Sequence, residues 1–405
     1  MGGGPAGLMA AEVLATAGVA VTVVEHRRSV GRKLLLAGRG GLNLSHTESL
    51  DTFLSRYGPA APQLRAAIEA FGPDDLRAWA ASLGQATFVG TSGRVFPEAF
   101  RATPLLRAWL ARLADLGVTI ETGRRWAGWP AAGNGALVVE PDGAEQQLYA
   151  DVVVLALGGA SWPRTGSDGA WVPVVRAAGI DVRSLRAANA GLQVRWTETF
   201  AERFAGEPLK NVAVTVGDDR HGGLLSRGDV IVTGTGLEGG PIYAHSAAVR
   251  SRLDSEGRAT LHLDLTPDRT GEELTQRLNR RRPKDSFAST ARRTLGLAPV
   301  AAALLREATA NNVPTDPVAL ATLVKAVPLA ITGLADIDRA ISSAGGIALD
   351  EVDDRFMLRR CPGTFVAGEM LDWEAPTGGY LLQATFSTAV AAARGALVNA
   401  DGPGE

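Results

Sequence analysis

The chain has little cysteine and no strong excess of charge of either sign. Cys361 is the one cysteine among 405 residues, which excludes an internal disulfide, a cysteine-rich zinc site and a paired-cysteine redox centre. The formal net charge is −2. Proteins that wrap nucleic acid or lie on anionic membranes need a basic excess, so we expect no nucleic-acid partner and no membrane partner.

Long apolar runs and metal-ligand patterns are also missing. No apolar run reaches the roughly 18 residues needed to span a bilayer, and the opening MGGGPAGLMAAE lacks the basic start of a signal peptide. We therefore expect a cytoplasmic protein. We expect no metal site either, because the histidines show no metal-ligand spacing and no HExxH pattern; they are His26, His46, His221, His245 and His262.

The chain is rich in glycine, and it opens on a glycine array followed by a helix and a strand. Gly2, Gly4 and Gly7 form a G-x-G-x-x-G array, and a run of small residues typical of a helix follows. Residues 19–24 (VAVTVV) are almost continuously apolar, as in a parallel strand buried on both faces. Glu25 directly follows this run.

Each part of the array has a physical role in binding a dinucleotide. Gly2 allows a tight turn, Gly4 lets the backbone approach a pyrophosphate, and Gly7 lets helix and strand pack closely. The helix N-terminus presents unsatisfied N–H groups and a positive dipole to the diphosphate. Glu25 can accept hydrogen bonds from an adenosine ribose, and an acid there favours a free 2′-hydroxyl. The array therefore predicts a Rossmann-like, dinucleotide-binding domain.

The buried strand that should precede the array is missing, since Met1 directly precedes Gly2. That strand normally lies near the middle of the sheet, so its absence would leave neighbouring strands with unpaired backbone groups. Either the true start lies upstream of Met1, or the chain is natively truncated. We expect the sequence as written to bind its cofactor poorly or to fold badly.

A glycine-rich, polar segment follows at residues 31–48 (GRKLLLAGRGGLNLSHTE). A nicotinamide-binding domain usually returns quickly to its next βαβ unit. A long polar loop instead suits a flavin dinucleotide, which must be held along its pyrophosphate, ribityl chain and ring. Within the loop, Lys33 is a candidate to pair with the pyrophosphate, with a plain surface lysine as the alternative. Asn43 is a second candidate to hold the middle of the cofactor.

Two later segments place glycine directly after predicted strands. Residues 148–157 (LYADVVVLAL) predict a buried strand that ends in Gly158 and Gly159, where bare backbone lets a ligand approach. Residues 365–367 predict a short strand that runs into Gly368. A simple glycine turn is the alternative for Gly158 and Gly159.

A long helix is predicted from Thr377-Gly378-Gly379-Tyr380 to about Asn399. Its first N–H groups could face a flavin ring and stabilise the negative charge of the reduced form. A simple helix cap is the alternative for the threonine and the first glycine.

Several of these segments resemble signatures of one flavoprotein family. Residues 155–171 (LALGGASWPRTGSDGAW) resemble its A-x-G-G-x-S-x-P-x-T-G-S block, and residues 365–389 (FVAGEMLDWEAPTGGYLLQATFSTA) resemble its A-G-E-x-L-D…T-G-G-Y-N-L-Q signature. Residues 31–48 and 93–118 are similar to further family segments. On these motifs the chain resembles the HI0933-like family, within the two-dinucleotide-binding flavoproteins, over most of its length. Leu382 departs from the pattern, where the family commonly has asparagine.

The resemblance implies an FAD-dependent oxidoreductase that passes hydride through flavin N5 to or from a small organic substrate, including reduction of a conjugated C=C bond. It implies FAD as the cofactor, with NADH or NADPH as a candidate electron donor. Gly368 and Glu369 would hold the ribityl and pyrophosphate portion. Gly378, Gly379 and Tyr380 would flank the ring. No catalytic proton donor can be named from the sequence.

The character of the chain changes between residues 189 and 342. Alternating apolar and polar residues predict half-exposed strands, and helical patterns follow, one with a capping box at Thr270 and Glu273. We expect an α/β protein in which residues 1–188 and 343–405 form the FAD-binding domain. Residues 189–342 would form an inserted β-barrel-like and helical domain on the substrate side.

A second glycine array lies inside this insert, at Gly234, Gly236 and Gly239. Taken alone, it suggests a nicotinamide site. Pro241 follows it closely, and the next predicted strand, TLHLDL, alternates apolar and polar residues as a half-exposed antiparallel strand does. These features favour a tight structural turn or an active-site loop.

Two other functions stay open. A flavin-dependent RNA-modifying protein would use a related fold, and Arg277, Arg280, Arg281 and Arg282 could contact phosphate or RNA, although a solvated helix end also explains them. A flavin-binding protein without turnover fits if the first strand is truly absent. The oligomeric state is not indicated by the sequence.

Overall fold

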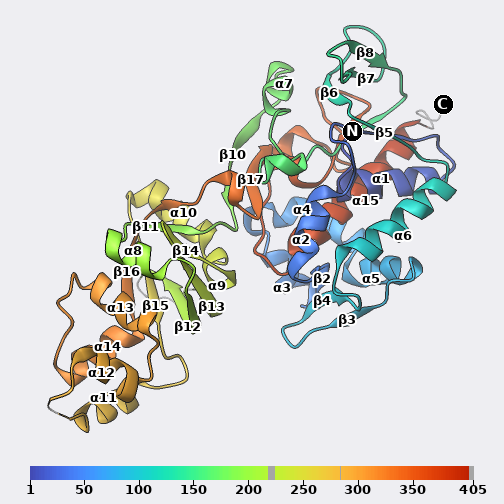
Figure 1. Cartoon of the computed structure of the whole chain (residues 1–405). Helices are drawn as coiled ribbons and strands as arrows, with labels where there is room; N and C mark the ends of the chain where they lie inside the picture. The colour runs from blue at the N-terminus through green and yellow to red at the C-terminus, as the bar shows by residue number, and fades with distance from the viewer. Residues whose placement is uncertain (218–223, 283, 401–405) are drawn as a thin grey trace. The chain divides into compact units, whose positions relative to one another are not determined.

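The computed structural model describes residues 1–217, 224–282 and 284–400. The chain divides into two compact units (Figure 1): unit 1 comprises residues 1–186 and 341–405, and unit 2 comprises residues 187–340. The borders expected from the sequence, 188/189 and 342/343, lie two residues from the observed ones. The fold class is confirmed as α/β, with a Rossmann-type FAD-binding unit and an inserted unit that is part barrel and part helical.

Unit 1 holds parallel strands in two separate pairs. β1 (Thr22–Glu25) pairs with β5 (Thr119–Thr122), and β9 (Val153–Leu155) pairs with β18 (Thr364–Val366). In the described residues each pair forms a sheet of its own.

The first two residues of the chain bridge these pairs. The Met1 amino group donates a hydrogen bond to Val154 O (2.7 Å), and Ala156 N donates to Met1 O (2.8 Å). On the other side, Gly2 N donates to Val24 O (2.7 Å). The glycine turn is therefore hydrogen-bonded to both strand pairs.

Two alanine-rich helices pack against each other beside these strands, α1 (Pro5–Thr16) and α15 (Tyr380–Ala400). Small side chains let the two backbones approach closely. By length and composition α15 is the one helix in the described chain that could cross a membrane, but 61% of that window is buried inside the structure, which is typical of a core helix. The buried alanines of the pair are Ala6, Ala10, Ala11, Ala15, Ala384, Ala389, Ala392, Ala393 and Ala396.

Two predicted strands differ from the structure. The strand expected at 19–24 starts late, because Val19 N donates to Leu14 O and so closes the end of α1. The strand expected at 148–157 is two strands, β8 (Glu145–Leu148) and β9. Exposed residues break it, among them Tyr149 at 81% exposure.

The segment at 31–48 was expected to be a loop, and this was wrong for its first part. Gly31 is left-handed (φ 69°) and directly precedes the helix α2 (Arg32–Ala37). The helix forms because Leu34 is a buried anchor, 1% exposed, within a run of good helix formers. A short strand, β2 (Ser45–His46), follows it.

The remaining elements of unit 1 form small sheets and surrounding helices. Three-stranded antiparallel sheets have the orders β2-β4-β3 and β6-β7-β8, and β10 pairs with β17. Their bounds are β3 (Thr87–Val89), β4 (Arg94–Pro97), β6 (Arg125–Gly128), β7 (Ala136–Val139), β10 (Val182–Ala188) and β17 (Ser342–Ile347). The helices are α3 (Leu50–Ser55), α4 (Ala61–Ala70), α5 (Pro73–Ser82), α6 (Ala102–Asp115), α7 (Val172–Ala177) and the 3-10 turn η8 (Gly368–Met370).

Unit 2 is a closed barrel with helices packed on it. The strand order is β11-β14-β13-β12-β15-β16; the strands are β11 (Leu192–Val194), β12 (Pro208–Val216), β13 (Ser226–Thr233), β14 (Gly236–Glu238), β15 (Ala259–Asp264) and β16 (Val327–Leu334). The helices are α8 (Glu198–Phe204), α9 (Gly240–Tyr243), α10 (Ser246–Glu256), α11 (Gly271–Asn279), α12 (Phe287–Thr290), the π-helical turn η5 (Ala291–Leu295), α13 (Pro299–Ala308) and α14 (Pro317–Lys325).

Two predictions for this unit are confirmed. The capping box at Thr270 and Glu273 starts α11. The second glycine array is a structural turn, because Gly234 lies in the hairpin between β13 and β14, and Gly236 is paired within the barrel.

Candidate functional site

The glycine array forms the turn that leads from the bridging residues into α1. Gly2 has φ +100°, a conformation that favours glycine, and a Cβ there would collide with the backbone of Ala156. Gly4 is the N-cap of α1, and no side chain caps this helix. A Cβ on Gly4 would meet nothing within 4 Å. The first turn of α1 therefore offers uncapped N–H groups beside open space, which suits a diphosphate.

Gly7 allows α1 to lie close to its own turn. A Cβ on Gly7 would collide with Gly2 O, and it would lie 3.5 Å from the Cβ of Ala156. The third glycine of the array is thus required by contact between backbones.

Glu25 ends β1 beside this turn and is 8% exposed. One of its carboxylate oxygens accepts a hydrogen bond from Gly3 N, and the other accepts one from Arg27 N, both at 2.8 Å. A carboxylate oxygen can accept a second hydrogen bond. Glu25 is therefore oriented by the backbone and retains acceptor capacity for ribose hydroxyls.

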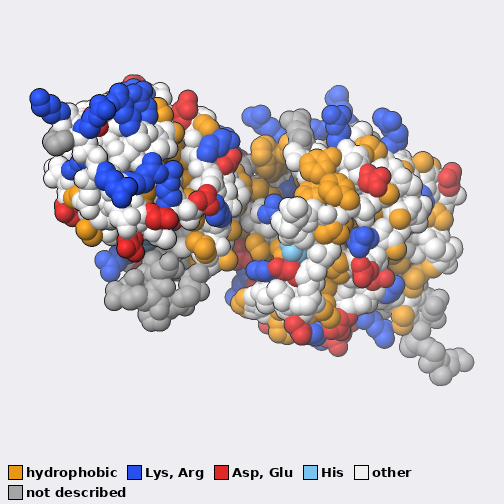
Figure 2. All heavy atoms as spheres, turned by 90° about the horizontal axis from the view of Figure 1, so that it is seen from below, with side chains coloured by type: hydrophobic (Ala, Val, Ile, Leu, Met, Phe, Trp, Pro, Cys, Tyr) orange, Lys and Arg blue, Asp and Glu red, His pale blue; other side chains and the backbone are white. Residues whose placement is uncertain are grey.

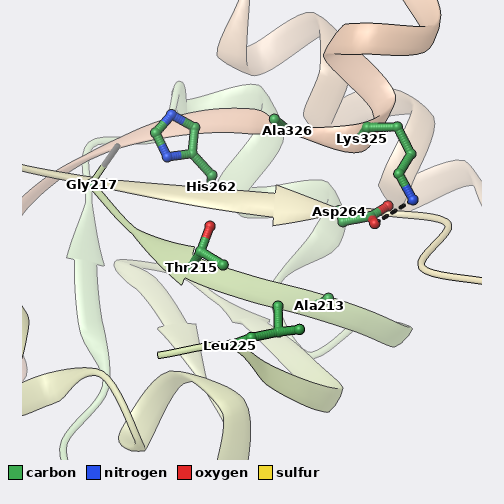
Figure 3. A pocket seen from close by; sticks show the side chains of 8 residues that line it. All are labelled: Ala213, Thr215, Gly217, Leu225, His262, Asp264, Lys325 and Ala326. Atoms are coloured by element: carbon green, nitrogen blue, oxygen red, sulfur yellow. Dashed lines mark ion pairs between the residues drawn. The ribbon is translucent and has the colours of Figure 1, made fainter. Parts of the chain in front are cut away.

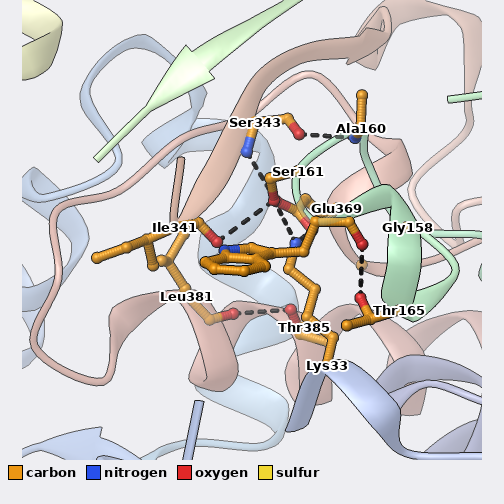
Figure 4. Close-up of polar contacts among 12 residues, drawn as sticks. Lys33, Gly158, Ala160, Ser161, Thr165, Ile341, Ser343, Glu369, Leu381 and Thr385 are labelled. Atoms are coloured by element: carbon orange, nitrogen blue, oxygen red, sulfur yellow. Dashed lines mark hydrogen bonds and ion pairs between the residues drawn. The ribbon is translucent and has the colours of Figure 1, made fainter. Parts of the chain in front are cut away.

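Lys33 and Glu369 meet in a half-buried network that joins four segments (Figure 4). The Lys33 ammonium lies 2.6 Å from Glu369 Oε2 and donates to Ser161 Oγ at 2.6 Å. The second Glu369 oxygen accepts from Ser343 N at 2.7 Å. Ser343 Oγ in turn accepts from Ala160 N at 2.8 Å. Lys33 was considered for the pyrophosphate and Glu369 for the middle of the cofactor, and the structure brings them together.

Gly159 lies against the same network, and Gly158, which precedes it, lies against Ser167. Gly158 has φ +76°, and a Cβ on Gly159 would collide with Ser343 Oγ and lie 3.1 Å from Glu369 Cδ. Asn43 Oδ1 is buried and has no hydrogen-bond partner in the described chain. A buried amide oxygen without a donor is costly, so Asn43 is suited to a ligand that supplies a hydroxyl or N–H group.

Two glycines with positive φ lead the chain into α15. Gly378 has φ +137° and Gly379 has φ +98°, and a Cβ on Gly379 would collide with the backbone of Ser45. The Tyr380 side chain is only 4% exposed, and its hydroxyl donates to Glu48 Oε2 at 2.8 Å. The Tyr380 phenol is therefore held in the core, and the place of this residue beside a ring stays a prediction.

Glu48 is held by two donors. The Arg56 guanidinium bonds to both carboxylate oxygens, and Tyr380 adds a third hydrogen bond. The hydrogen bond from Arg56 is the main cause that lowers the pKa of Glu48 below its ordinary 4.5, partly opposed by burial. Burial and the Glu48 carboxylate raise the pKa of Tyr380.

The Glu48 site predicts a pH-dependent loss of stability. Because folding lowers the pKa of Glu48, the ionised carboxylate stabilises the folded state. This contribution to the free energy of unfolding is complete above about pH 4.5 and is lost as the pH falls through and below that value. Urea unfolding at pH 7 and in steps below pH 5 should show Glu48→Gln less stable than wild type at pH 7, with a gap that narrows on acidification. The exposed Glu98→Gln is the control; a Glu48→Gln gap that stays constant with pH would contradict the assignment.

The chemistry of these residues fits FAD. The uncapped start of α1 lies beside open space at Gly4, and the buried Asn43 Oδ1 lacks a donor. Gly7, against the backbone of Gly2, and Gly159, against the side chain of Ser343, leave no room for a Cβ. Anion-binding N–H groups, an unsatisfied acceptor and bare backbone match a diphosphate joined to a polyhydroxyl chain.

Sequence reasoning missed three residues of this region. Ser161 and Ser343 hold the Lys33–Glu369 pair, and Arg56 holds Glu48. Ser161 carried a signal, because it lies in the G-G-x-S block. Ser343 and Arg56 carried none, since the contact between Ala160 and Ser343 spans 183 residues of sequence.

Other candidate sites are weaker. In the described residues no group of three or more His, Cys, Asp or Glu could hold a metal ion, and His221 lies outside the described residues. Unit 2 has a cavity of about 370 Å³ on its barrel (Figure 3), where Lys325 is paired to Asp264 at 2.5 Å. The arginines of α11 and the loop after it are mostly exposed, and blue side chains gather on unit 2 in Figure 2.

Comparisons with known proteins agree with this geometry. The family model described as HI0933-like protein Rossmann domain matches residues 1–395. The chain is 27% identical over 409 residues to a 3-dehydro-bile acid delta(4,6)-reductase of Clostridium scindens, covering 98% of both chains.

Two solved structures share the fold at low sequence identity. The 3-ketosteroid-delta4-(5alpha)-dehydrogenase of Rhodococcus jostii RHA1 has a TM-score of 0.51 at 17% identity, covering 99% of this chain and 96% of that one. The 3-ketosteroid delta1-dehydrogenase of Sterolibacterium denitrificans has a TM-score of 0.54 at 15% identity, covering 98% of each.

Proposed function

Since the chain belongs to the HI0933-like protein Rossmann-domain family and is an FAD-dependent oxidoreductase, we propose that it reduces a C=C bond. The bond would be conjugated to a carbonyl group in a fused-ring compound. The observation that carries the proposal is the 27% identity to a bile acid delta(4,6)-reductase along 98% of both chains. The residues proposed to hold the cofactor extend along the same chain, from Gly2 to Tyr380.

The chain's own residues would bind and orient the cofactor. The uncapped N–H groups of α1 would bind the diphosphate, and Glu25 would accept hydrogen bonds from the adenosine ribose. Lys33 and Glu369 would hold the middle portion, and the N–H groups and positive dipole at the start of α15 would stabilise negative charge on the ring. Bound there, FAD supplies hydride chemistry at N5, which amino-acid side chains do not provide.

The reductant would come from solution as NADH or NADPH. The one cysteine cannot form a dithiol, and in the described residues no metal-binding cluster is present to store electrons. One nicotinamide hydride and one proton from solvent balance the addition of two hydrogens across the double bond. No side chain is assigned as the donor of that proton.

The test separates the reductant from the substrate. Protein with bound FAD is first reduced under anaerobic conditions, in one sample with NADH or NADPH and in a parallel sample with dithionite. Each sample is then mixed with a 3-oxo-Δ4 bile acid. We expect the reduced flavin to be reoxidised by this compound and the product to gain two hydrogens by mass spectrometry. The saturated 3-oxo compound is the control. Failure of the dithionite-reduced protein to transfer electrons to the Δ4 compound would overturn the proposal.

A further inference from the structure

A strip of aromatic side chains leads away from the start of α15 along the sheet β2-β4-β3. The His46 ring on β2 stacks on Tyr380, with ring centroids 5.4 Å apart. Farther along the sheet, Phe96 on β4 stacks on Phe88 of β3 at 5.7 Å and on Phe100 at 4.9 Å. Phe88 and Phe100 also stack on each other, at 6.0 Å.

Strand register places His46, Phe88 and Phe96 on one face of the sheet. His46 is paired with Arg94, and Phe88 is paired with Phe96. Directly opposite residues in an antiparallel pair share a face, and so do residues two apart on one strand. Arg94 and Phe96 are two apart on β4. The face therefore carries the imidazole of His46, the guanidinium of Arg94 and the rings of Phe88 and Phe96, which with Phe100 form what we call the phenylalanine ladder. Val95, which is buried, points to the core.

The ladder is open to solvent instead of being buried. Phe88 is 38% exposed and Phe100 is 44% exposed. Figure 2, which views the molecule from below, shows hydrophobic side chains gathered on this side of unit 1. Three stacked phenylalanines would gain more by burial in a core, so their exposure indicates a surface that binds something apolar.

Phe100 is held in a conformation that costs energy. Its φ is +56°, which is rare for a bulky residue. Its ring lies over Gly41, where any side chain would collide with it. Backbone strain of this kind persists where the surrounding structure enforces it, often at a ligand-binding site. Gly41 belongs to the loop that also carries Asn43, so the ladder adjoins the proposed cofactor site.

Arg94 supplies a charge beside the ladder. Its side chain is exposed, and the structure gives it no hydrogen bond or ion pair within the described residues. The face thus combines a flat apolar platform with one cation. It complements a flat, apolar ring system that ends in a carboxylate.

We propose that Phe88, Phe96 and Phe100 form the platform on which the fused rings of the substrate stack, and that Arg94 binds an acidic group at the end of that substrate. This inference rests on the proposed function for the identity of the ring system. It adds the residues that select the substrate: the ladder recognises the rings, and Arg94 distinguishes acidic from neutral ring compounds.

Two probes separate these roles. Dissociation constants for 4-androstene-3,17-dione, which is neutral, and for a 3-oxo-Δ4 bile acid are measured by calorimetry on the protein with bound FAD. The variants are Phe88→Ala/Phe100→Ala, the milder Phe88→Leu/Phe100→Leu and Arg94→Gln. The control is Tyr149→Ala, which removes an aromatic side chain that is 81% exposed and directly follows β8. FAD content and melting temperature verify that each variant is folded.

We expect the double alanine variant to bind both probes about tenfold more weakly, with a smaller loss for the leucine variant, because aromatic contact area is lost. Arg94→Gln should weaken the acid severalfold and leave the dione unchanged. Tyr149→Ala should change neither.

Two binding results would overturn the inference: unchanged binding of the probes to folded ladder variants, and wild-type protein that binds neither probe. A concentration-dependent dimer that the ladder variants abolish would also overturn it, because a second copy of the chain would then occupy the ladder. Wild-type protein that binds both probes through the ladder without reducing them would overturn the proposed function and leave this inference standing.

Discussion

Gly7→Ala is expected to abolish FAD binding and to lower the free energy of unfolding by about 3 kcal/mol, the upper part of the range for overpacking. The added Cβ would collide with Gly2 O, a backbone atom that is itself fixed by the hydrogen bond from Gly2 N to Val24 O. Neither partner is a flexible side chain. The helix must therefore move away from its own glycine turn, and the uncapped N–H groups at its start move with it.

Gly18→Ala is the matched control. Gly18 has φ +84°, but a Cβ there would meet nothing within 4 Å, so the cost is the left-handed backbone alone, about 1 kcal/mol. The ratio of FAD to protein after purification and urea unfolding of both variants give the comparison. Normal FAD content in Gly7→Ala would contradict the packing role assigned to this glycine.

Glu369→Ala is expected to destabilise the protein by about 3 kcal/mol, the lower end of the range for breaking a buried ion pair. The Glu369 side chain is 14% exposed and that of Lys33 is 26% exposed, so both charges are largely shielded from water. Truncation leaves the Lys33 ammonium without its counter-charge and the N–H of Ser343 without its acceptor. Because Gly159 lies against the same carboxylate, FAD content should fall as well.

A double-mutant cycle assigns this loss to the pair. Lys33→Ala and the double variant Lys33→Ala/Glu369→Ala complete the cycle. The loss in free energy of unfolding of the double variant should be smaller than the sum of the losses of the two single variants. Glu369→Gln keeps an acceptor for Ser343 and should recover part of the stability. Additive single losses would show that the two side chains are energetically independent.

Local patterns predicted the parts of the site that depend on backbone chemistry. A glycine array before small residues requires a tight turn and a helix start, and the structure has both at Gly2 and Gly4. The capping box at Thr270 and Glu273 is likewise a contact between residues three apart. Such features are set by neighbours in sequence, so sequence alone suffices for them.

Contacts between distant segments were beyond that reasoning. Lys33 and Glu369 were each considered as cofactor contacts, but their pairing joins residues 336 apart, and Ser161 and Ser343 complete it. The burial of the Tyr380 phenol depends on Glu48 and Arg56, which come from a different part of the chain. The start of β1 and the break between β8 and β9 also depended on the tertiary structure. An apolar run in the sequence does not show which partners its backbone groups will hydrogen-bond.

The amino-acid sequence by itself determined that this chain binds a dinucleotide, where its glycine turns lie, and which unit is inserted, because these follow from short-range spacing and composition. Only the tertiary structure decided which charged groups neutralise each other, which aromatic rings face water, and how the first two residues hold the strand pairs together. The physical reason is that pairing and burial are properties of surfaces assembled from remote segments, and their free energies arise only when those segments meet.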